Sequence, residues 1–197
     1  MNIAESNTLV NLMRAFSGES QARNRYTFAA GMADEQNLHC IKRIFDYTAD
    51  QEKEHAEQFF NCLRNAGIAN VQIEAGYPVD LKMDVAALLR AAQHNEFEEH
   101  QIAYPGFARV AREEGFVDIG MLFERIATVE LTHGNRFATL ADLLEEGMLF
   151  RAPQETDWIC LNCGYVHNGK EAPNKCPLCQ HNQGYYLRRE HAPYAGF

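Results

Sequence analysis

Residues 52–55 read Glu-Lys-Glu-His and residues 130–133 read Glu-Leu-Thr-His, so the tetrapeptide Glu-x-x-His occurs twice in this chain. On a helix, side chains three residues apart share a face, so the glutamate and histidine of each copy can bind the same metal ion. One copy would be weak support, because Glu and His are common on solvated helix faces. Two copies predict two related metal-binding half-sites.

Each copy has a glutamate partner earlier in the chain. Glu19 precedes Glu52 by 33 residues, and Glu96 precedes Glu130 by 34 residues. The chain is therefore internally two-fold, in the order Glu, Glu-x-x-His, Glu, Glu-x-x-His. This is the ligand set of dinuclear carboxylate sites in helical bundles of the ferritin-like type.

The second half carries one extra carboxylate. Glu99 lies one turn after Glu96, whereas Ala22 stands at the matching place after Glu19. Five carboxylates in a core would repel one another without cations, and two divalent ions would offset most of their charge. Hard oxygen ligands with one imidazole per metal suit iron or manganese. The alternative is that these acids are only surface charge. The predicted metal ligands are Glu19, Glu52, His55, Glu96, Glu99, Glu130 and His133.

Other polar side chains adjoin this predicted site. Tyr26 and Tyr104 each follow a predicted ligand by five to seven residues, so both can approach the site, although such tyrosines often only fill a core. Glu54 and Glu98 are neighbours of ligands in sequence, but helical geometry directs them elsewhere, and we expect them to face solvent.

The surrounding sequence is helical in pattern. Apolar residues at helical spacing predict four long helices, over about 8–37, 39–66, 84–114 and 117–146. Short connections make two antiparallel hairpins, and the stretch 67–83 is long enough to cross between them. We therefore predict a mainly α chain with a ferritin-like four-helix bundle and a long crossover. Pro105 falls inside the third helix, where it should kink the helix or interrupt its hydrogen bonding.

The end of the chain has a different composition. Residues 1–150 hold 13 basic and 23 acidic groups, whereas residues 151–197 hold five basic and four acidic groups and four of the six cysteines. The shift predicts two domains, a bundle over 1–148 and a small C-terminal metal-binding domain over 155–197.

Two Cys-x-x-Cys motifs lie in that small domain. Cys160 and Cys163, followed by Cys176 and Cys179, bring four thiolates to one tetrahedral centre. Such a centre can hold iron or zinc, so a structural zinc ribbon is the alternative.

Composition also limits the partners and the compartment. A net charge of −9 at pH 7 without a basic run argues against binding to nucleic acid or to an anionic membrane surface. The apolar runs are too short to span a bilayer, and the first residues lack signal-peptide features, so we expect a cytoplasmic protein. Cysteines there indicate metal more than disulfides. Cys40 and Cys62, on the second helix, are expected to be ordinary buried thiols.

These motifs together resemble the rubrerythrin family over nearly the whole chain. Residues 17–26, Ser-Gly-Glu-Ser-Gln-Ala-Arg-Asn-Arg-Tyr, resemble its first ligand motif, and residues 52–56, Glu-Lys-Glu-His-Ala, resemble its second. Glu96 and Glu99 followed by Tyr104-Pro105 resemble its third, which also accounts for the proline. The segment 158–179, with its two Cys-x-x-Cys motifs, resembles the rubredoxin-like end of that family.

The resemblance implies an activity and its partners. It implies a non-haem di-iron peroxidase, linked to NADH, that reduces hydrogen peroxide to water in oxidative stress defence. Electrons would pass from a donor protein, which is a rubredoxin, a ferredoxin or an NAD(P)H-linked reductase, through an Fe(Cys)₄ centre to two irons, with zinc as a substitute metal. It also implies a homodimer in which the cysteine centre of one subunit serves the di-iron site of the other.

The resemblance further implies a role for each site residue. Glu52 and Glu130 would bridge the two irons. Glu19 would hold one iron, and Glu96 with His133 the other. Glu99 and His55 would exchange on the first iron, with His55 bound in the reduced state and Glu99 in the oxidised state. Tyr26 and Tyr104 would donate hydrogen bonds to site carboxylates, which completes the predicted catalytic set of Glu99, His55, Tyr26 and Tyr104.

One departure and two other functions stay open at this point. Gln180 follows Cys179 where rubredoxins usually have glycine, which puts the amide-to-sulfur bonding of that centre in question. The other functions are iron oxidation or storage, as in ferritin-like relatives, and a zinc-ribbon interaction module on a helical bundle with surface acids. The fused cysteine domain and Glu99 argue against iron storage.

Overall fold

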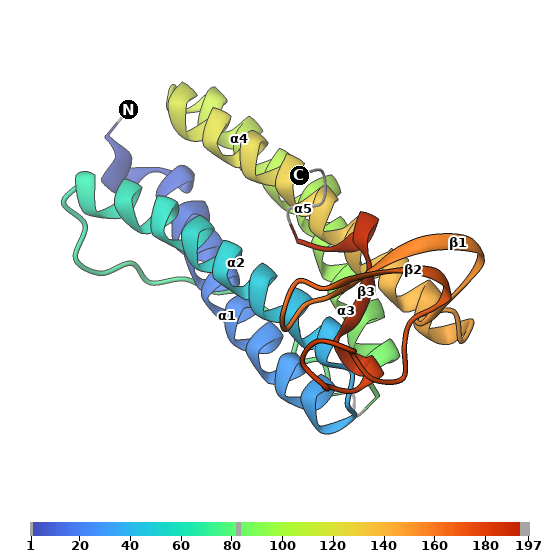
Figure 1. Cartoon of the computed structure of the whole chain (residues 1–197). Coiled ribbons are helices and arrows are strands. Elements are labelled where there is room, and N and C mark those ends of the chain that lie inside the picture. The colour runs from blue at the N-terminus through green and yellow to red at the C-terminus, as the bar shows by residue number, and fades with distance from the viewer. Residues whose placement is uncertain (1, 82–83, 194–197) are drawn as a thin grey trace.

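Two antiparallel helical hairpins form the body of the molecule (Figure 1). The computed structural model describes residues 2–81 and 84–193. The first hairpin pairs α1 (Asn7–Glu35) with α2 (His39–Asn65), and its helices begin and end within a few residues of the predicted bounds. The side chain of Ser6 accepts a hydrogen bond from the backbone N–H of Leu9, which caps α1.

The second hairpin contains an interruption. It consists of α3 (Val85–Glu98), the π-helix η2 (Glu99–Ala103), α4 (Tyr104–Glu113) and α5 (Val117–Glu145). Pro105 was expected to disturb the third predicted helix, and the disturbance takes the form of this π-helical turn just before it. The backbone N–H of Tyr104 bonds to the carbonyl of Glu99, five residues back. Single π turns inside helices frequently mark functional sites.

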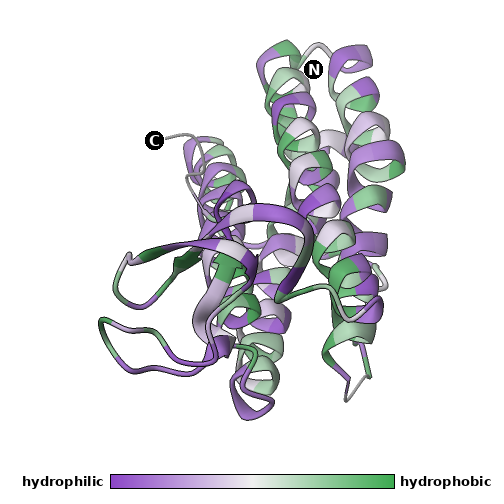
Figure 2. Cartoon of the chain, turned by 45° about the vertical axis from the view of Figure 1, so that its right-hand side comes forward, coloured by the Kyte–Doolittle hydropathy of each residue, from purple (hydrophilic) through white to green (hydrophobic). Residues whose placement is uncertain are grey.

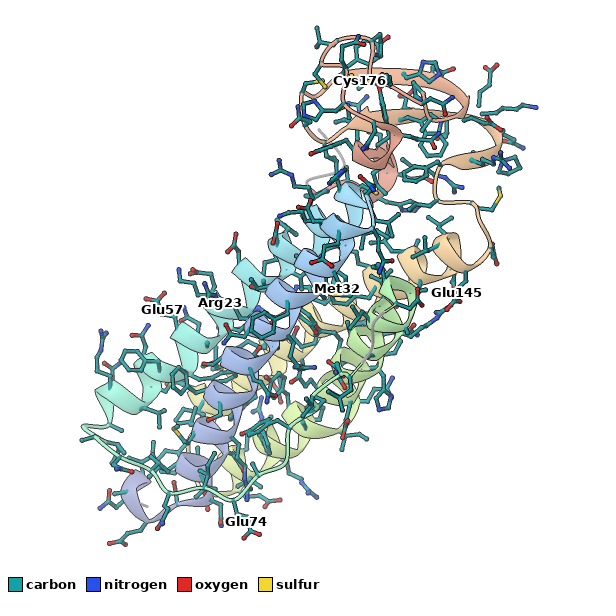
Figure 3. The ribbon with its side chains drawn as sticks, turned by 90° about the horizontal axis from the view of Figure 1, so that it is seen from below. Arg23, Met32, Glu57, Glu74, Glu145 and Cys176 are labelled. Carbon is teal, nitrogen blue, oxygen red and sulfur yellow. The ribbon has the colours of Figure 1, made fainter. Side chains whose placement is uncertain are left out.

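The crossover between the hairpins runs along the bundle, past the labelled Glu74 (Figure 3). It is fastened by polar contacts to residues that are distant in sequence. The Tyr77 hydroxyl donates to the carbonyl of Arg14 at 2.9 Å, and Arg25 Nη1 lies 2.6 Å from Asp80 Oδ2. Asp80 has a φ of 52°, in the left-handed region that few residues other than glycine adopt. The four-helix arrangement with one long crossover is the predicted fold.

The core of the bundle is divided into two apolar parts. One part, built around Ile41, Phe45 and Phe137, lies toward the α1–α2 turn, and the other, built around Phe59 and Phe123, lies toward the opposite end. Each fully buried side chain of this kind contributes about 1.5–3 kcal/mol. The helices of the bundle carry both hydrophobic and hydrophilic residues along their length (Figure 2), as expected when one side of a helix packs on the others. The predicted metal ligands occupy the level between the two apolar parts.

A three-stranded antiparallel sheet forms the C-terminal module, which we define as residues 151–193. Its strands are β1 (Arg151–Cys160), β2 (Val166–Glu171) and β3 (Tyr186–Arg188), in the order β2-β1-β3. Trp158 is fully buried in it, and its indole N–H donates to the carbonyl of Gly169 at 2.9 Å.

This module packs against the end of its own bundle, beyond Met32 and Glu145 (Figure 3). The ring of Tyr185 stacks on His39 with centroids 4.1 Å apart, and Leu187 is part of the apolar cluster at that end of the bundle. A Cβ atom on Gly184 would lie 1.9 Å from the carbonyl oxygen of Asn37, so only glycine permits this approach. β1 begins before the expected start of the second domain, and the division into 1–148 and 155–197 stays a prediction.

None of the helices in residues 2–81 and 84–193 combines the length and apolar character needed to cross a bilayer.

Candidate metal centres

Two groups of donor atoms meet inside the bundle. Within each group, one ligand atom per residue lies within 4.8 Å of all the others. The first group is Glu19, Glu52, His55 and Glu130, and the second is Glu52, Glu96, Glu130 and His133. Two glutamates, Glu52 and Glu130, therefore belong to both groups, as expected for carboxylates shared by a pair of metal ions.

The helices explain how side chains so distant in sequence converge. Glu19 comes from α1 and Glu96 from α3, whereas α2 and α5 each contribute one Glu-x-x-His pair, whose members face the same way. Glu19, Glu52, Glu96 and Glu130 are at most 1% exposed. Four carboxylates buried side by side are costly, so the arrangement calls for a compensating positive charge.

The hydrogen bonding of these residues is incomplete in a way that fits metal ions. Among the described residues, six buried ligand atoms have no hydrogen-bond partner: Glu19 Oε2, Glu52 Oε1, Glu96 Oε2, both carboxylate oxygens of Glu130 and His133 Nδ1. His133 Nδ1 lies 2.8 Å from Glu130 Oε2 and 2.9 Å from Glu52 Oε1, but these contacts lack hydrogen-bond geometry. Atoms that converge without bonding one another suit a shared cation. Carboxylate oxygens with one imidazole per site are ligands for iron or manganese.

The pKa values of the site residues reflect the same crowding. Burial raises the pKa of Glu19 and of Glu96 well above its usual value, and the neighbouring carboxylates raise it further. Burial also raises the pKa of Glu52, but His133 and His55 outweigh burial and hold that pKa below its usual value. Burial lowers the pKa of His55, but the carboxylates of Glu130 and Glu52, each 3.0 Å from its Nδ1, outweigh burial and raise that pKa to about 9. The raised pKa values favour bound protons in the metal-free protein, and divalent ions would replace those protons.

Two tyrosines fix the glutamates that belong to one group only. The hydroxyl of Tyr26 donates to Glu96 Oε1, and the hydroxyl of Tyr104 donates to Glu19 Oε1. Both tyrosines are 2% exposed. Each hydroxyl leaves the second oxygen of its glutamate free to face the donor groups, so the structure brings both predicted tyrosines into contact with the site.

Glu99 occupies a different place from the other predicted ligands. It lies at the start of the π-helix and belongs to neither four-residue group. Burial, and after it the charge of Glu96, raises the pKa of Glu99 well above its usual value. It lines a cavity of about 190 Å³ together with Gly18, Tyr77 and Tyr104. A Cβ atom on Gly18 would lie 3.5 Å from the Tyr77 ring and 3.8 Å from Glu99 Oε1. Glu99 therefore stands beside the donor groups, on the side of this cavity.

The structure also adds a residue that sequence reasoning missed. Gln51, immediately before Glu52, has its side-chain oxygen 3.1 Å from His133 Nε2. A metal-binding histidine generally uses its other ring nitrogen for a hydrogen bond, so a partner for His133 could be expected. The partner of that bond lies on another helix, so the sequence alone could not identify it.

Glu54 and Glu98, which follow metal-ligand candidates in the sequence, were expected to face solvent. Both side chains are exposed in the structure, as expected.

The four cysteines of the C-terminal module form a separate cluster. One ligand atom from each of Cys160, Cys163, Cys176 and Cys179 lies within 4.8 Å of the others, and all four are free thiols. Sγ of Cys160 lies 3.8 Å from that of Cys179. This cluster is the arrangement of a tetrahedral metal centre.

Backbone amides reach the sulfur atoms of this cluster despite the glutamine after Cys179. Gln180 adopts a φ of 62°, the conformation that glycine would take most readily. The backbone N–H of His181 bonds to Cys179 and lowers the pKa of that thiol to about 6. The replacement of glycine therefore does not remove this amide-to-sulfur bond.

Of the remaining thiols, Cys40 is buried as expected, but Cys62 is partly exposed, so the prediction for Cys62 is wrong. Its side chain packs only partly against the apolar cluster around Phe59 and Phe123, whereas that of the next residue, Leu63, is buried in that cluster.

Comparison with known proteins agrees with both clusters. The family model described as "Rubrerythrin" matches residues 11–141, and the model described as "Rubrerythrin, rubredoxin-like domain" matches residues 158–187. The chain is 44% identical to a rubrerythrin of Clostridium perfringens over 181 residues, which cover 91% of this chain and 92% of that protein. It is 43% identical to a rubrerythrin of Porphyromonas gingivalis over 185 residues, which cover 94% and 91% of the two chains.

Solved structures give the same result for the fold. A structure of nigerythrin in a mixed-valent state has a TM-score of 0.62 and 27% identity, and covers 95% of this chain and 93% of that one. A bacterioferritin of Desulfovibrio desulfuricans has a TM-score of 0.65 at 21% identity over 72% of this chain and 82% of that one, and so shares the fold of the bundle. Because two family models match the bundle and the cysteine module in this order, and relatives at 42–44% identity match over nine-tenths of the chain, this chain belongs to the rubrerythrin family.

Proposed function

We propose that this protein is a non-haem di-iron peroxidase that reduces hydrogen peroxide to water with electrons relayed through its cysteine centre. The observation that carries the proposal is the presence in one chain of two kinds of donor cluster. One is a buried carboxylate and histidine cluster with unpaired ligand atoms beside a small cavity, and the other is a closed set of four thiols. The first suits a reaction centre and the second suits electron transfer.

The reaction consumes one hydrogen peroxide, two electrons and two protons, and it forms two water molecules as the O–O bond breaks. Iron ions held by the two donor groups would supply these two electrons, and an iron held by the four thiolates would replace them. Four thiolates leave no open coordination position, so peroxide would react at the carboxylate cluster and not at the cysteines.

The residues of the chain prepare the site in three ways. Tyr26 and Tyr104 hold the glutamates that belong to one donor group only, so that each keeps one oxygen directed at the cluster. The cavity that Gly18, Tyr77 and Glu99 line admits only a small molecule. Glu99 lines the same cavity, and in our proposal it exchanges with His55 as the site is oxidised and reduced.

Several partners follow from the same proposal. The electron donor is a rubredoxin, a ferredoxin or an NAD(P)H-linked reductase that reaches the cysteine centre, and NADH is the final source of electrons. The protein works as a homodimer in the cytoplasm, in defence against oxidative stress. Iron storage is the weaker reading, because this chain carries a cluster of four thiols in addition to the carboxylate cluster of the bundle.

The relay is tested by replacing a cysteine of the cluster. We expect Cys160→Ser to lose steady-state peroxide reduction with a donor that enters through the cysteine centre. A single oxidation of the chemically reduced di-iron site by peroxide should survive in the same variant. Cys62→Ser, which changes a thiol outside the cluster, is the matched control and should behave as the original protein. Full steady-state turnover by Cys160→Ser would contradict the relay.

A further inference from the structure

The two histidines of the donor groups are held differently. His133 is 1% exposed, and its Nε2 lies 3.1 Å from the side-chain oxygen of Gln51. His55 has a side chain that is 13% exposed, and its Nδ1 lies 3.0 Å from Glu52 Oε2. No residue in the described part of the chain forms a hydrogen bond with Nε2 of His55.

The difference has a counterpart in the two-fold pattern of the sequence. Gln51 immediately precedes Glu52, and the residue at the matching place before Glu130 is Val129. The valine side chain can neither donate nor accept a hydrogen bond. The position that provides an anchor for His133 in one half therefore carries no polar group in the other half.

Gln51 is itself held in the orientation that this contact needs. Its side-chain nitrogen donates to the hydroxyl of Tyr47 at 3.4 Å, and its amide oxygen faces Nε2 of His133. The guanidinium group of Arg136 lies over the Tyr47 ring, 5.2 Å from its centroid. The anchor is thus part of a chain of contacts between α2 and α5.

An amide oxygen at Nε2 determines the state of the imidazole. It accepts the Nε2–H, which fixes the tautomer and leaves the lone pair of Nδ1 free for a metal ion that Glu52 and Glu130 would also bind. The same bond opposes rotation of the ring. An imidazole without such a bond, such as His55, can turn away at lower cost.

We propose that Gln51 is a positioning residue that keeps His133 on the metal in every redox state, and that the difference between Gln51 and Val129 makes His55 the histidine that can leave. This inference rests on the proposed di-iron function, because it explains which histidine exchanges with Glu99. It adds to that function a determinant outside the predicted ligand set.

The first test uses the unmodified, iron-loaded protein in its reduced state. Paramagnetic NMR detects the ring N–H proton of each iron-bound histidine as a shifted signal. We expect the signal of His133 to exchange slowly with solvent and that of His55 to exchange rapidly, since only His133 has an acceptor at Nε2. Equal and rapid exchange of both signals would overturn the inference without any variant.

The second test removes the anchor. Gln51→Val should weaken the binding of ferrous iron to one of the two positions by about 10–100-fold, as measured by competition with a chelator, because losing such a partner typically has this effect. Gln51→Glu, which keeps an acceptor oxygen, should restore the affinity. Wild-type affinity in Gln51→Val would contradict the inference.

The third test adds an anchor to the other half. In Val129→Gln we expect His55 to stay bound in crystal structures of both redox states, and peroxide turnover to fall. If the unmodified protein binds two irons and reduces peroxide but none of these changes occurs, the role of Gln51 is wrong and the proposed function stands. If the unmodified protein binds no iron, the proposed function itself fails.

Discussion

At the scale of single residues, the sites depend on a few carboxylates whose neighbours in sequence do not take part. Glu52 is in both donor groups, whereas Glu54, two residues later, faces solvent. The Glu-x-x-His spacing was enough to predict this distinction, because helical geometry assigns each residue to a face. The spacing could not reveal the role of Gln51, whose partner lies on a different helix.

The shared glutamates give the first prediction. In Glu52→Ala both donor groups lose a common ligand, so we expect the purified protein to contain neither iron of the dinuclear site. Metal analysis of protein from iron-supplied cells measures this, with Glu54→Ala as the matched control that should retain both irons. The metal-free bundle can even gain stability, because one of several crowded acids is gone. Two irons per chain in Glu52→Ala would remove Glu52 from its shared position.

Glu99 gives the second prediction. The two donor groups are complete without it, so Glu99→Ala should still bind two ferrous ions. Peroxide turnover should fall at least tenfold, which corresponds to a barrier about 1.4 kcal/mol higher, because the exchange with His55 is lost. Glu54→Ala, the matched control, changes an exposed glutamate that does not line the cavity beside Glu99 and should turn over normally. Oxidised and reduced structures in which Glu99 is unbound in both states would contradict the exchange.

At the scale of elements, the helices were predictable and their interruption was only partly so. Apolar periodicity placed all four helices within a few residues, since each buries one face along its whole length. Pro105 signalled a disturbance in the third, but not that it would be a π-helix with Glu99 at its start. The ion pair that holds the crossover against α1 could not be predicted either, because Arg25 and Asp80 are 55 residues apart in the sequence.

The crossover gives the third prediction. Asp80 pairs with Arg25 at 2.6 Å, with side chains only 16% and 10% exposed, and accepts a hydrogen bond from Asn95 at 3.3 Å. Asp80→Ala removes these partners and places alanine at a φ of 52°, so we expect a loss of about 1–3 kcal/mol in the free energy of unfolding.

Asp80→Asn separates the causes of that loss. Asparagine tolerates the left-handed conformation and can still accept from Asn95, so it should lose less stability than alanine. Urea unfolding of the metal-loaded proteins measures both variants, and protease cleavage within residues 74–81 should increase in the order of the loss. Equal stability of the original protein and both variants would show that the ion pair does not hold the crossover.

At the scale of the whole molecule, metal ions and folding are linked through the charges of the site. Burial among like charges raises the pKa of Glu19, Glu96 and Glu99. Carboxylates around His55 and His133 outweigh the effect of burial and raise the pKa of both histidines. Groups whose pKa is raised by folding stabilise the protein at low pH and lose that contribution as the pH rises. Glu52, whose pKa is lowered, acts in the opposite direction.

The fourth prediction follows from this balance. The metal-free protein should lose stability as the pH rises from about 5 to about 9, because five groups of the bundle site release protons that the fold had favoured. Glu52 is ionised in the folded and the unfolded protein over this range, and Cys179, whose pKa is lowered to about 6, opposes the loss only in part. The iron-loaded protein should show a smaller loss over the same range, since metal ions replace those protons. Melting temperatures of both forms across this range test the prediction. A metal-free protein that becomes more stable as the pH rises would contradict it.

The central claim is that two irons in the bundle and one in the cysteine module act together as a peroxide-reducing chain. Anaerobic titration of the fully reduced, iron-loaded protein with hydrogen peroxide tests it most directly, because no electron donor is needed. Three ferrous ions store three electrons and each peroxide takes two, so we predict that three molecules of peroxide oxidise every two chains. In Cys160→Ser, loaded only at the dinuclear site, one molecule should oxidise each chain. Release of dioxygen, or irons that stay ferrous in excess peroxide, would contradict the account.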